Sequence, residues 1–416
     1  MLSSELIKQR ALEAGFDLAG VAPLPPSEDL EFSRRWVEQG FCGEMHYLRN
    51  PKRAHPRRVL SSARSAVCVG LIYNAPLPYS IECGTAHSGA HGAKATREAS
   101  DLSVGPRAWI SRYAWGRDYH SVMRERLERL RKTIETLAPG VETRVFVDTG
   151  PLNERTLARY SGIGWMGKNT CIINERTGSW FFLGILLTSL ELAPDMPAPD
   201  RCGSCTRCLE ACPTHAFVRP YVMDASRCIA YFTIELKGSI PEELRPAVGR
   251  NVFGCDICQD VCPWNSKTVA PEPGDHDAPA LGRRSVAVTG IPEFQPLKLK
   301  PQPSAAPESL FNPPLECLAS LTADDFCSVF KDSPIQRAKY RGWLRNLCVA
   351  IGNSGNRRFL PWLSRLLGHP GTLVQEHAAW ALQRIAADRT APDGPSGFSP
   401  KISQIKSALT DPREIV

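Results

Sequence analysis

Eight cysteines gather in one short part of the sequence, between Cys202 and Cys262. The first four follow the spacing Cys202-x2-Cys205-x2-Cys208-x3-Cys212, and a proline follows the last of them. Bacterial ferredoxins use this spacing to bind two iron–sulfur clusters, with the fourth cysteine binding the other cluster. Three thiolates two residues apart let one tight loop occupy three corners of a cube. The spacing therefore predicts electron-transfer chemistry.

A second motif, Cys255-x2-Cys258-x3-Cys262-Pro263, is one cysteine short of the ferredoxin repeat. Cys228 is the only other cysteine nearby, and it can supply the missing ligand. We therefore predict two [4Fe–4S] clusters with four cysteine ligands each. One set is Cys202, Cys205, Cys208 and Cys262, and the other is Cys212, Cys228, Cys255 and Cys258.

Zinc is the alternative occupant, because CxxC pairs are also typical zinc ligands. Zinc would leave the middle cysteine of the CxxCxxC motif without a role, and it would not need a proline after each last cysteine. The spacing therefore favours iron. Most of the other seven cysteines lie in apolar contexts and are predicted to be small buried hydrophobic residues. They are Cys42, Cys68, Cys83, Cys171, Cys317, Cys327 and Cys348.

Two clusters form an electron path, and such a path must end at a group that is reduced. No GxGxxG motif follows a strand-like segment, so the sequence carries no flavin or nicotinamide fingerprint. The residues before the clusters are expected to hold the reduced group. Among them, Asp148 lies where the strand-like segment 143–147 meets a Gly-Pro turn, a common position for site residues in α/β domains. An aspartate that caps the amides of the turn is the alternative interpretation.

The elements that position these residues alternate between helix-like and strand-like patterns over the first 200 residues, which predicts an α/β (α+β) N-terminal domain at 1–200. A ferredoxin-like module follows at 201–268. A proline-rich linker is predicted at 269–335, and short apolar helical stripes predict an α-helical, HEAT-like repeat domain at 336–416. Strands are expected at 66–73, 143–147 and 179–190, helices at 2–14 and 122–137, and a surface loop at 80–105.

Composition places the chain among ordinary globular proteins. It has 416 residues, 43% of them hydrophobic and 22% charged, which excludes a wholly disordered chain and fits two or three domains. The longest apolar stretch, 180–190, is about half of a membrane span, and the first residues lack the pattern of a secretory signal. We expect a cytoplasmic monomer without a membrane-spanning segment.

The excess positive charge lies in the predicted helical domain. Residues 336–416 contain 12 Lys and Arg against 5 Asp and Glu, whereas the whole chain contains 50 against 43, so residues 1–335 are neutral. Such charges often only solvate helices, but contacts of Lys and Arg with phosphate dominate nucleic-acid affinity. The basic residues include Arg337, Lys339, Arg341, Arg345, Arg357, Arg358 and Arg365.

Several blocks of the sequence resemble the epoxyqueuosine reductases, cobalamin-dependent enzymes that complete queuosine in tRNA anticodons. The resemblance runs from about residue 5 to residue 268 and continues more weakly into the helical tail. It rests on both cysteine motifs and on the segments SRYAWGRDYH at 111–120, VDTGPLNER at 147–155, GIGWMGKN at 162–169 and RCIAYFTIE at 227–235.

The resemblance implies reduction of epoxyqueuosine to queuosine at the wobble position of tRNA, the last step of queuosine biosynthesis. It implies a cobalamin between the N-terminal domain and the cluster module, with electrons passing from a low-potential donor through the clusters to cobalt. It also implies that Asp148 is the proton donor, because opening an epoxide builds negative charge on oxygen. A carboxyl group donates a proton near neutral pH only if burial raises its pKa.

The resemblance further implies corrinoid contacts around Asp148, with a surface role for Arg53 and capping roles for Lys168 and Asn169 as alternatives. The expected contacts are Asp148, Arg53, Tyr113, Lys168, Asn169 and Asp256. The segment Asp118-Tyr119-His120 begins like the Asp-x-His-x-x-Gly motif that supplies a histidine ligand to cobalt in other cobalamin enzymes. Its glycine is missing, and we interpret the match as chance.

Two other functions fit the same residues. A corrinoid iron–sulfur reductive dehalogenase shares the cofactors, but it usually carries a twin-arginine export signal and is not expected to have a helical tail. An electron-transfer protein would dock a redox partner and bind no corrinoid. Bound corrinoid would exclude the carrier, and turnover of a modified tRNA would exclude the dehalogenase.

Overall fold

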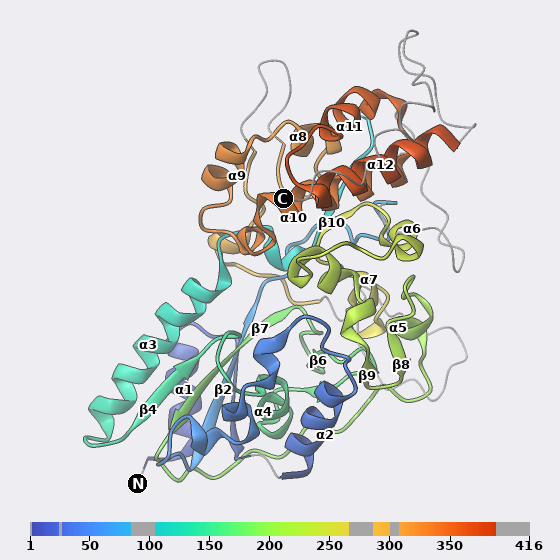
Figure 1. The fold of residues 1–416 in the computed structure, drawn as a ribbon. Helices are drawn as coiled ribbons and strands as arrows, with labels where there is room; N and C mark the ends of the chain where they lie inside the picture. Colours follow the sequence, from blue (N-terminus) through green and yellow to red (C-terminus); the bar gives the residue numbers. More distant parts are fainter. Residues whose placement is uncertain (1, 25–26, 85–104, 266–285, 300–307, 388–416) are drawn as a thin grey trace, which may run out of the picture.

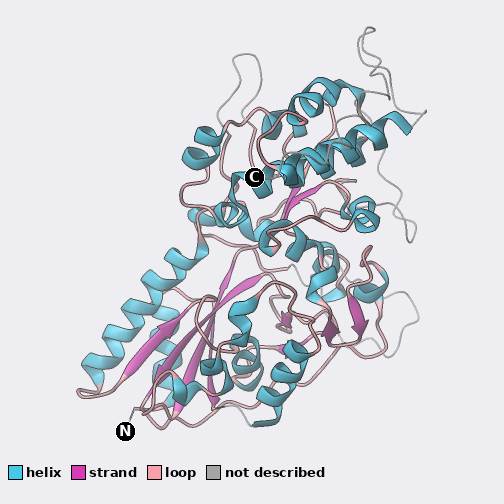
Figure 2. Ribbon diagram, in the orientation of Figure 1, coloured by secondary structure: helices cyan, strands magenta, loops and turns pink. Residues whose placement is uncertain are grey.

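The computed structural model describes residues 2–24, 27–84, 105–265, 286–299 and 308–387 (Figures 1 and 2). Most of the loop predicted at 80–105 lies outside these ranges, as do parts of the linker predicted at 269–335 and the end of the helical tail.

A four-stranded antiparallel sheet forms the centre of the N-terminal domain (Figure 1). Its strands, in spatial order, are β1 (Leu18–Pro23), β2 (Ser65–Ile72), β7 (Phe181–Thr188) and β4 (Thr143–Phe146). The strands predicted at 66–73, 143–147 and 179–190 are confirmed as β2, β4 and β7. Because every pairing is antiparallel, the domain is α+β, and the strand-end rule for parallel α/β sheets does not account for the position of Asp148.

Helices cover both faces of this sheet. α1 (Ser4–Glu13) and α3 (Tyr119–Leu137), the two helices predicted from periodicity, pack on the face that contains Val69 of β2. α4 (Glu154–Tyr160) packs on the opposite face, which contains Cys68. Successive side chains of a strand point to opposite faces, so β2 is buried along its whole length. This double coverage explains its continuous apolar sequence.

The cluster module lies beside the sheet and is built from short elements. β3 (Trp109–Ile110) of the N-terminal domain pairs in parallel with β10 (Asn251–Phe253) of the module, which joins the two parts. The module contains the hairpin of β8 (Phe217–Arg219) with β9 (Val222–Met223) and the helices α5 (Arg207–Glu210), α6 (Arg245–Val248) and α7 (Ile257–Asp260). The N-terminal domain also contains α2 (Ser27–Glu38) and the hairpin of β5 (Trp165–Met166) with β6 (Ile172–Ile173).

The last described part is helical and begins earlier than predicted. Two helices lie inside the stretch interpreted as an irregular linker, because its prolines precede the helices instead of interrupting them. A glycine at 352 lets α10 and α12 approach closely, since an added Cβ would lie 2.8 Å from the Trp380 ring. The HEAT-like repeat itself stays a prediction. The helices are α8 (Leu315–Ala319), α9 (Ala323–Val329), α10 (Lys339–Ser354), α11 (Leu360–Leu366) and α12 (Thr372–Ala387).

One hydrophobic core joins the helical part to the cluster module. At its centre, Arg345 is 1% exposed and donates to the carbonyl oxygens of Phe232, Leu236 and Gly238. Asn346, next to it, donates to two further carbonyls of the module. Arg345 was predicted to belong to a basic tRNA-binding surface. The structure corrects this, because the guanidinium is buried and its hydrogen bonds join α10 to the cluster module.

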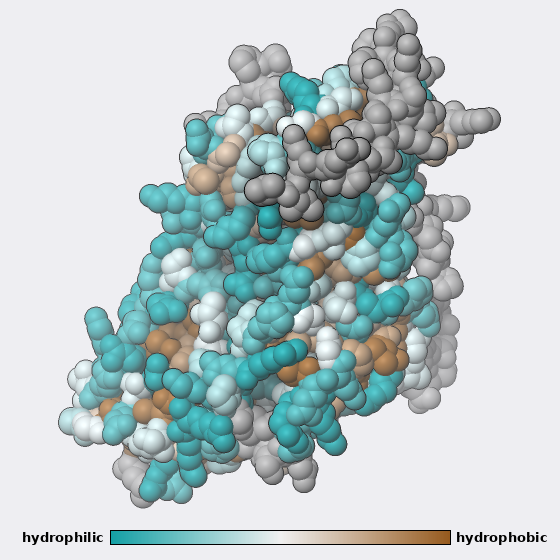
Figure 3. Space-filling model, in the orientation of Figure 1, coloured by the Kyte–Doolittle hydropathy of each residue, from teal (hydrophilic) through white to brown (hydrophobic). Residues whose placement is uncertain are grey.

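The surface view in Figure 3 shows hydrophilic residues over most of this face, with small hydrophobic patches between them. Among the described residues, no helix combines the length and the hydropathy that crossing a membrane requires.

Candidate functional site

The clustered cysteines fall into two groups in space. Burial and the neighbouring thiols Cys202 and Cys205 raise the pKa of Cys208 to about 11. Burial also raises the pKa of Cys262 to about 12, with Cys208 and Cys202 among the neighbours that add to the shift. Cys262 comes from the second motif, so its position beside the first three cysteines is a feature of the fold. These four are the first predicted ligand set.

The second group has the same character. Burial raises the pKa of Cys228 to about 11, and Cys212 adds to the shift. Burial, Cys228 and Cys212 raise the pKa of Cys255 well above its usual value. Cys258 is close enough to Cys255 and Cys228 to be affected by both. A cysteine that was expected to be a mere hydrophobic residue, Cys171, lies within hydrogen-bonding distance of Cys258.

Within the described ranges, no three Cys, His, Asp or Glu side chains converge closely enough to hold a single metal ion. The preference for iron over zinc rests on the spacing of the cysteines in the sequence.

The β5–β6 hairpin lies beside the first group. Burial raises the pKa of Cys202, and the neighbouring backbone N–H of Lys168 and indole of Trp165 oppose that shift. The buried Trp165 Nε1 has no hydrogen-bond partner among the described residues, which leaves it able to donate to a cluster ligand.

Two predicted corrinoid contacts on this hairpin hold the cysteine loops instead. Lys168 is 9% exposed, and its Nζ donates to the carbonyl oxygens of Gly203 at 2.6 Å and Cys205 at 2.9 Å. Asn169 donates to the carbonyl oxygen of Cys258 at 3.2 Å. Each residue thus fastens one cluster loop to the N-terminal domain. A corrinoid contact of either side chain stays a prediction.

Asp256, another predicted corrinoid contact, also forms hydrogen bonds within the protein. Its carboxylate is 1% exposed and accepts hydrogen bonds from Trp109 Nε1, Ser111 Oγ and the backbone N–H of Arg112. It therefore braces the junction of β3 and the cluster module. Tyr113, beside it, is packed among aromatic rings, and burial raises the pKa of its hydroxyl well above the usual value, with the charge of Asp148 adding to the shift.

Asp148 lies on a tight loop between β4 and α4. Its backbone has φ of 53°, a left-handed conformation that aspartate tolerates better than most residues, and its N–H donates to Glu154 Oε1 at 2.7 Å. Arg53 holds the same loop by donating to the carbonyl oxygens of Gly150 and Leu152 at 3.0 and 2.9 Å. The loop is fixed while the Asp148 side chain stays 60% exposed. The carboxylate is therefore accessible from solvent on a loop whose backbone is held in place.

His120 is the functional candidate that the sequence interpretation missed. Its Nδ1 lies 2.7 Å from Asp118 Oδ1, and its Nε2 lies 3.4 Å from Asp148 Oδ2. The ring also stacks on Tyr119, with 4.1 Å between centroids. Asp118 caps α3 and so orients the imidazole at the first turn of that helix. The signal in the sequence was the Asp118-Tyr119-His120 segment, because its two polar ends contact each other here. That the segment is not a cobalt-ligand motif stays a prediction.

The electrostatics of this site differ from the expectation for Asp148. Burial opposes charge on the imidazole, but the carboxylates of Asp118 and Asp148 outweigh it and raise the pKa of His120 to about 9. Burial would raise the pKa of Asp148, yet the imidazole of His120 beside it lowers it overall. Burial and the charge of Asp148 raise the pKa of Glu154 to about 8. Near neutral pH the protons are therefore held by His120 and Glu154.

The helical part also reaches this site. The guanidinium of Arg337 pairs with both carboxylate oxygens of Glu235 and contributes to lowering the pKa of Asp148. Tyr47 lies between two cations, with Arg337 and Arg53 at 5.7 and 5.9 Å from the centre of its ring. Residues of the N-terminal domain, the cluster module and the helical part thus meet around one exposed carboxylate.

Two family models match parts of the chain that include these sites. The 4Fe-4S double cluster binding domain matches residues 201–265, which contain the eight clustered cysteines. The model described as epoxyqueuosine reductase QueG, DUF1730, matches residues 53–149, from Arg53 to the residue after Asp148. The cluster module is therefore a double [4Fe–4S] domain.

Curated relatives match nearly the whole chain. The epoxyqueuosine reductase of Xanthomonas campestris pv. campestris is 37% identical over 90% of this chain and 94% of its own. That of Pseudomonas aeruginosa is 38% identical over 92% and 94%, and that of Escherichia coli is 36% identical over 93% and 91%. The chain belongs to the epoxyqueuosine reductase family. It is thus an oxidoreductase, as the sequence predicted.

Solved structures of family members share the fold. An epoxyqueuosine reductase from Streptococcus thermophilus has a TM-score of 0.72 and 28% identity, covering 97% of this chain and 96% of its own. A complex with an epoxyqueuosine-modified tRNA-Tyr stem loop has a TM-score of 0.71 at 28% identity, covering 92% and 89%. A Bacillus subtilis structure, with a TM-score of 0.71 at 28% identity over 92% and 90%, has its catalytic aspartate loop swung out of the active site.

Proposed function

We propose that this chain reduces epoxyqueuosine in tRNA to queuosine, the last step of queuosine biosynthesis, with Asp148 as the proton donor. The observation that supports this most directly is the exposed Asp148 carboxylate 3.4 Å from the imidazole of His120, in a chain that also contains a double-cluster domain. Converting an epoxide into an alkene consumes two electrons and two protons and releases water. A site that stores both protons and electrons matches this balance.

The eight cysteines are the proposed cluster ligands, divided as the sequence predicted: Cys202, Cys205, Cys208 and Cys262 for one cluster, and Cys212, Cys228, Cys255 and Cys258 for the other. A cobalamin would lie beside Asp148. The residues there fit such a group, because the buried Nε of Arg53 has no partner among the described residues and could serve a corrinoid amide or phosphate. His120 faces carboxylates with both ring nitrogens, which fits a corrinoid without a histidine ligand.

Arg53, Tyr113 and Asp148 are therefore the residues proposed to hold the corrinoid. When bound, the clusters would supply single electrons and the corrinoid a reducible cobalt centre. The protein's own contribution is to hold a proton at Asp148 when the epoxide oxygen gains negative charge. Because Asp148 has a lowered pKa, it must take this proton from His120, which is within 3.4 Å. His120 acts as a positioning residue that keeps the pair protonated.

This relay predicts a particular pH dependence. The groups that face His120 are Asp118, Asp148 and Tyr119, with Glu154 and Arg337 behind Asp148. His120 is charged below its pKa of about 9, so turnover should fall as the pH rises through that value. The variant His120→Gln should lower single-turnover rates and remove this alkaline limb. An unchanged limb would assign it to another group, with Glu154→Gln as the next variant to measure.

Basic side chains near Asp148 suit the phosphates of an anticodon loop. Lys237, Lys339 and Arg341 are exposed close to Arg337, and Arg341 donates to the carbonyl oxygen of Lys237. Burial and the neighbouring cations lower the pKa of Lys237. An anionic strand would relieve this repulsion. We therefore propose that tRNA contacts begin at these residues beside the site and include Arg358, which is exposed after α10.

The two ends of this basic surface should behave differently. The double variant Lys339→Glu with Arg341→Glu should weaken binding of both a minimal anticodon stem-loop and full-length tRNA. Arg357→Glu with Arg358→Glu should weaken binding of full-length tRNA most at low salt and flatten its salt dependence, because fewer phosphate contacts release fewer counterions. The measurement is affinity across a salt series. Unchanged full-length affinity in the second variant would move the outer contacts elsewhere, to the surface around Arg117, because Arg112 nearby is buried and donates to carbonyl oxygens of the protein itself.

The direct test of the function is turnover. Anaerobically purified protein with its clusters and added cobalamin should convert an epoxyqueuosine-containing stem-loop to the queuosine form when a viologen supplies electrons, followed by mass spectrometry as a loss of one oxygen. Consumption of an aryl halide without tRNA turnover would support the dehalogenase instead. Absence of corrinoid binding would support the carrier.

A further inference from the structure

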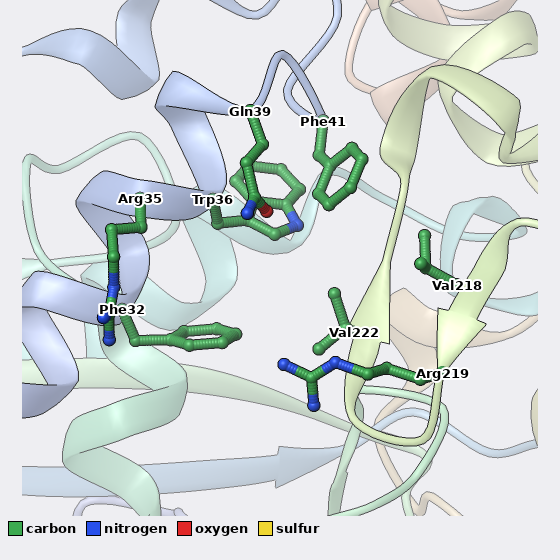
Figure 4. Close-up of a pocket in the computed structure, with 8 residues that line it drawn as sticks. All are labelled: Phe32, Arg35, Trp36, Gln39, Phe41, Val218, Arg219 and Val222. Carbon is green, nitrogen blue, oxygen red and sulfur yellow. The ribbon is translucent and has the colours of Figure 1, made fainter.

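A pocket of about 370 Å³ lies between α2 and the β8–β9 hairpin, and nothing in the proposed reaction uses it (Figure 4). Three aromatic rings and two valines form most of its lining, and a glutamine and two arginines complete it. Figure 4 shows the Phe32 ring and the Arg219 side chain extending toward each other from opposite walls. The lining residues are Phe32, Arg35, Trp36, Gln39, Phe41, Val218, Arg219 and Val222.

The walls of the pocket are fastened to each other. Trp36 Nε1 donates to the carbonyl oxygen of Met223 at 2.7 Å, and the backbone N–H of Ala225 donates to the carbonyl oxygen of Phe41 at 2.9 Å. The first bond joins α2 to β9, and the second joins the segments that directly follow these two elements. The pocket is thus preformed, which lowers the entropic cost of binding a partner.

The surface of the pocket is apolar and positively charged. Phe32 is 41% exposed and Val218 is 57% exposed, and they are two of the seven large hydrophobic side chains exposed among the described residues. The charged lining groups are Arg35 and Arg219, and neither forms an ion pair within the described ranges. An apolar patch bordered by positive charge is typical of a protein docking site for an acidic partner.

The position of the hairpin points to the kind of partner. β8 and β9 lie in the chain between Cys212 and Cys228, two proposed ligands of the same cluster. The backbone N–H of Ala216, just before β8, donates to Cys212 Sγ at 3.4 Å. A redox centre placed over the hairpin is therefore separated from a cluster by a few residues only. Electron transfer needs such short separations.

We propose that this pocket docks the electron donor, an acidic protein that carries a low-potential one-electron centre. The donor's centre gives up one electron and the nearer cluster gains it, and two such encounters supply one turnover. Tyrosine- and tryptophan-lined nucleic-acid sites also combine rings with arginine. Here, however, apolar side chains outnumber charged ones and the Trp36 indole N–H is already bonded, which favours a protein. The inference rests on the proposed reductase function.

The test compares two electron sources with the holoenzyme. In Arg35→Glu with Arg219→Glu, kcat/KM for an acidic [2Fe–2S] ferredoxin should fall about tenfold or more at low salt, because rim charges act on the association rate. Turnover with reduced methyl viologen, which needs no docking surface, should stay unchanged. The control Arg124→Glu with Arg129→Glu makes the same change in charge on α3, outside the pocket, and should have a smaller effect.

Two further variants keep the outcome clear. Arg35→Gln with Arg219→Gln should cause an intermediate loss, and Phe32→Ala should weaken ferredoxin-driven turnover without changing its salt dependence. Equal ferredoxin kinetics in all variants would overturn the proposal, and a loss of tRNA affinity instead would assign the pocket to tRNA. If the wild type failed to reduce modified tRNA with viologen, the reductase function would be wrong. Ferredoxin docking would still be measurable as oxidation of reduced ferredoxin by the clusters.

Discussion

Asp148→Asn should lower turnover of the modified stem-loop by about 10²–10⁴-fold, the contribution typical of a general acid. Asparagine keeps the size of the side chain and removes only its ability to carry the proton. It also accepts the left-handed backbone at φ 53° more readily than alanine does. The loop should therefore keep its conformation, and the loss should report chemistry rather than folding.

The measurement is a single-turnover rate under anaerobic conditions, with iron content and corrinoid binding determined on the same sample. Iron content should match the wild type, because Asp148 contacts none of the proposed cluster ligands, and corrinoid should still bind, because Arg53 and Tyr113 are intact and asparagine keeps the size of the side chain. Asp118→Asn is a useful comparison, since it weakens the orientation of His120 without touching Asp148 and should cost less. Activity of Asp148→Asn within about threefold of the wild type would contradict the proton-donor role, given the far larger loss expected of a general acid.

The cysteine motifs were readable from the sequence because ligand spacing in a loop is a local property. Two residues between cysteines fix how a loop wraps a cluster, whatever surrounds it. The ferredoxin rule also predicted that Cys262 joins the first ligand set, and Cys202 and Cys208 are among the groups that affect its pKa. The ligand sets themselves stay a prediction. The strands and helices of the N-terminal domain followed from periodicity for the same local reason.

Roles that depend on burial were not readable in the same way. Lys168, Asn169 and Asp256 are polar residues in a matching segment, and from sequence they resemble ligand contacts. Only the fold shows what their polar atoms contact. Lys168 and Asn169 donate to carbonyl oxygens, and Asp256 accepts from a buried hydroxyl and a buried backbone N–H. Arg345 gave the same false impression of a surface charge, because the sequence does not reveal the carbonyl oxygens that surround it.

The pairing of His120 with Asp148 depends on contacts between distant segments. His120 begins α3 and Asp148 follows β4, and the packing of α3 against the sheet brings them within 3.4 Å. The direction of the pKa shift at Asp148 follows from this contact. The sequence argument considered burial alone and so expected a raised pKa. The opposite charge beside the carboxylate reverses the result, because it lowers the pKa of Asp148 while the carboxylates raise that of His120.

Cys228→Ser should remove one of the two clusters and leave the other, so that iron falls from roughly eight to roughly four per chain. The serine hydroxyl is a poor replacement for a thiolate, and burial in this group disfavours any other charged ligand. Electron flow to the site should then stop, and tRNA turnover should be lost even with viologen. Iron analysis and low-temperature EPR of the reduced protein would show which cluster remains.

Cys171→Ser is the matched control, because Cys171 is the other cysteine in contact with this group. Its sulfur lies within hydrogen-bonding distance of Cys258, whereas Cys228 is associated with Cys212 and Cys255. If Cys228 is the eighth ligand, Cys171→Ser keeps both clusters and changes at most the potential of one, through the lost contact with Cys258. The reverse pattern, full iron in Cys228→Ser and half in Cys171→Ser, would make Cys171 the ligand. The second cluster would then be held partly by the β5–β6 hairpin of the N-terminal domain.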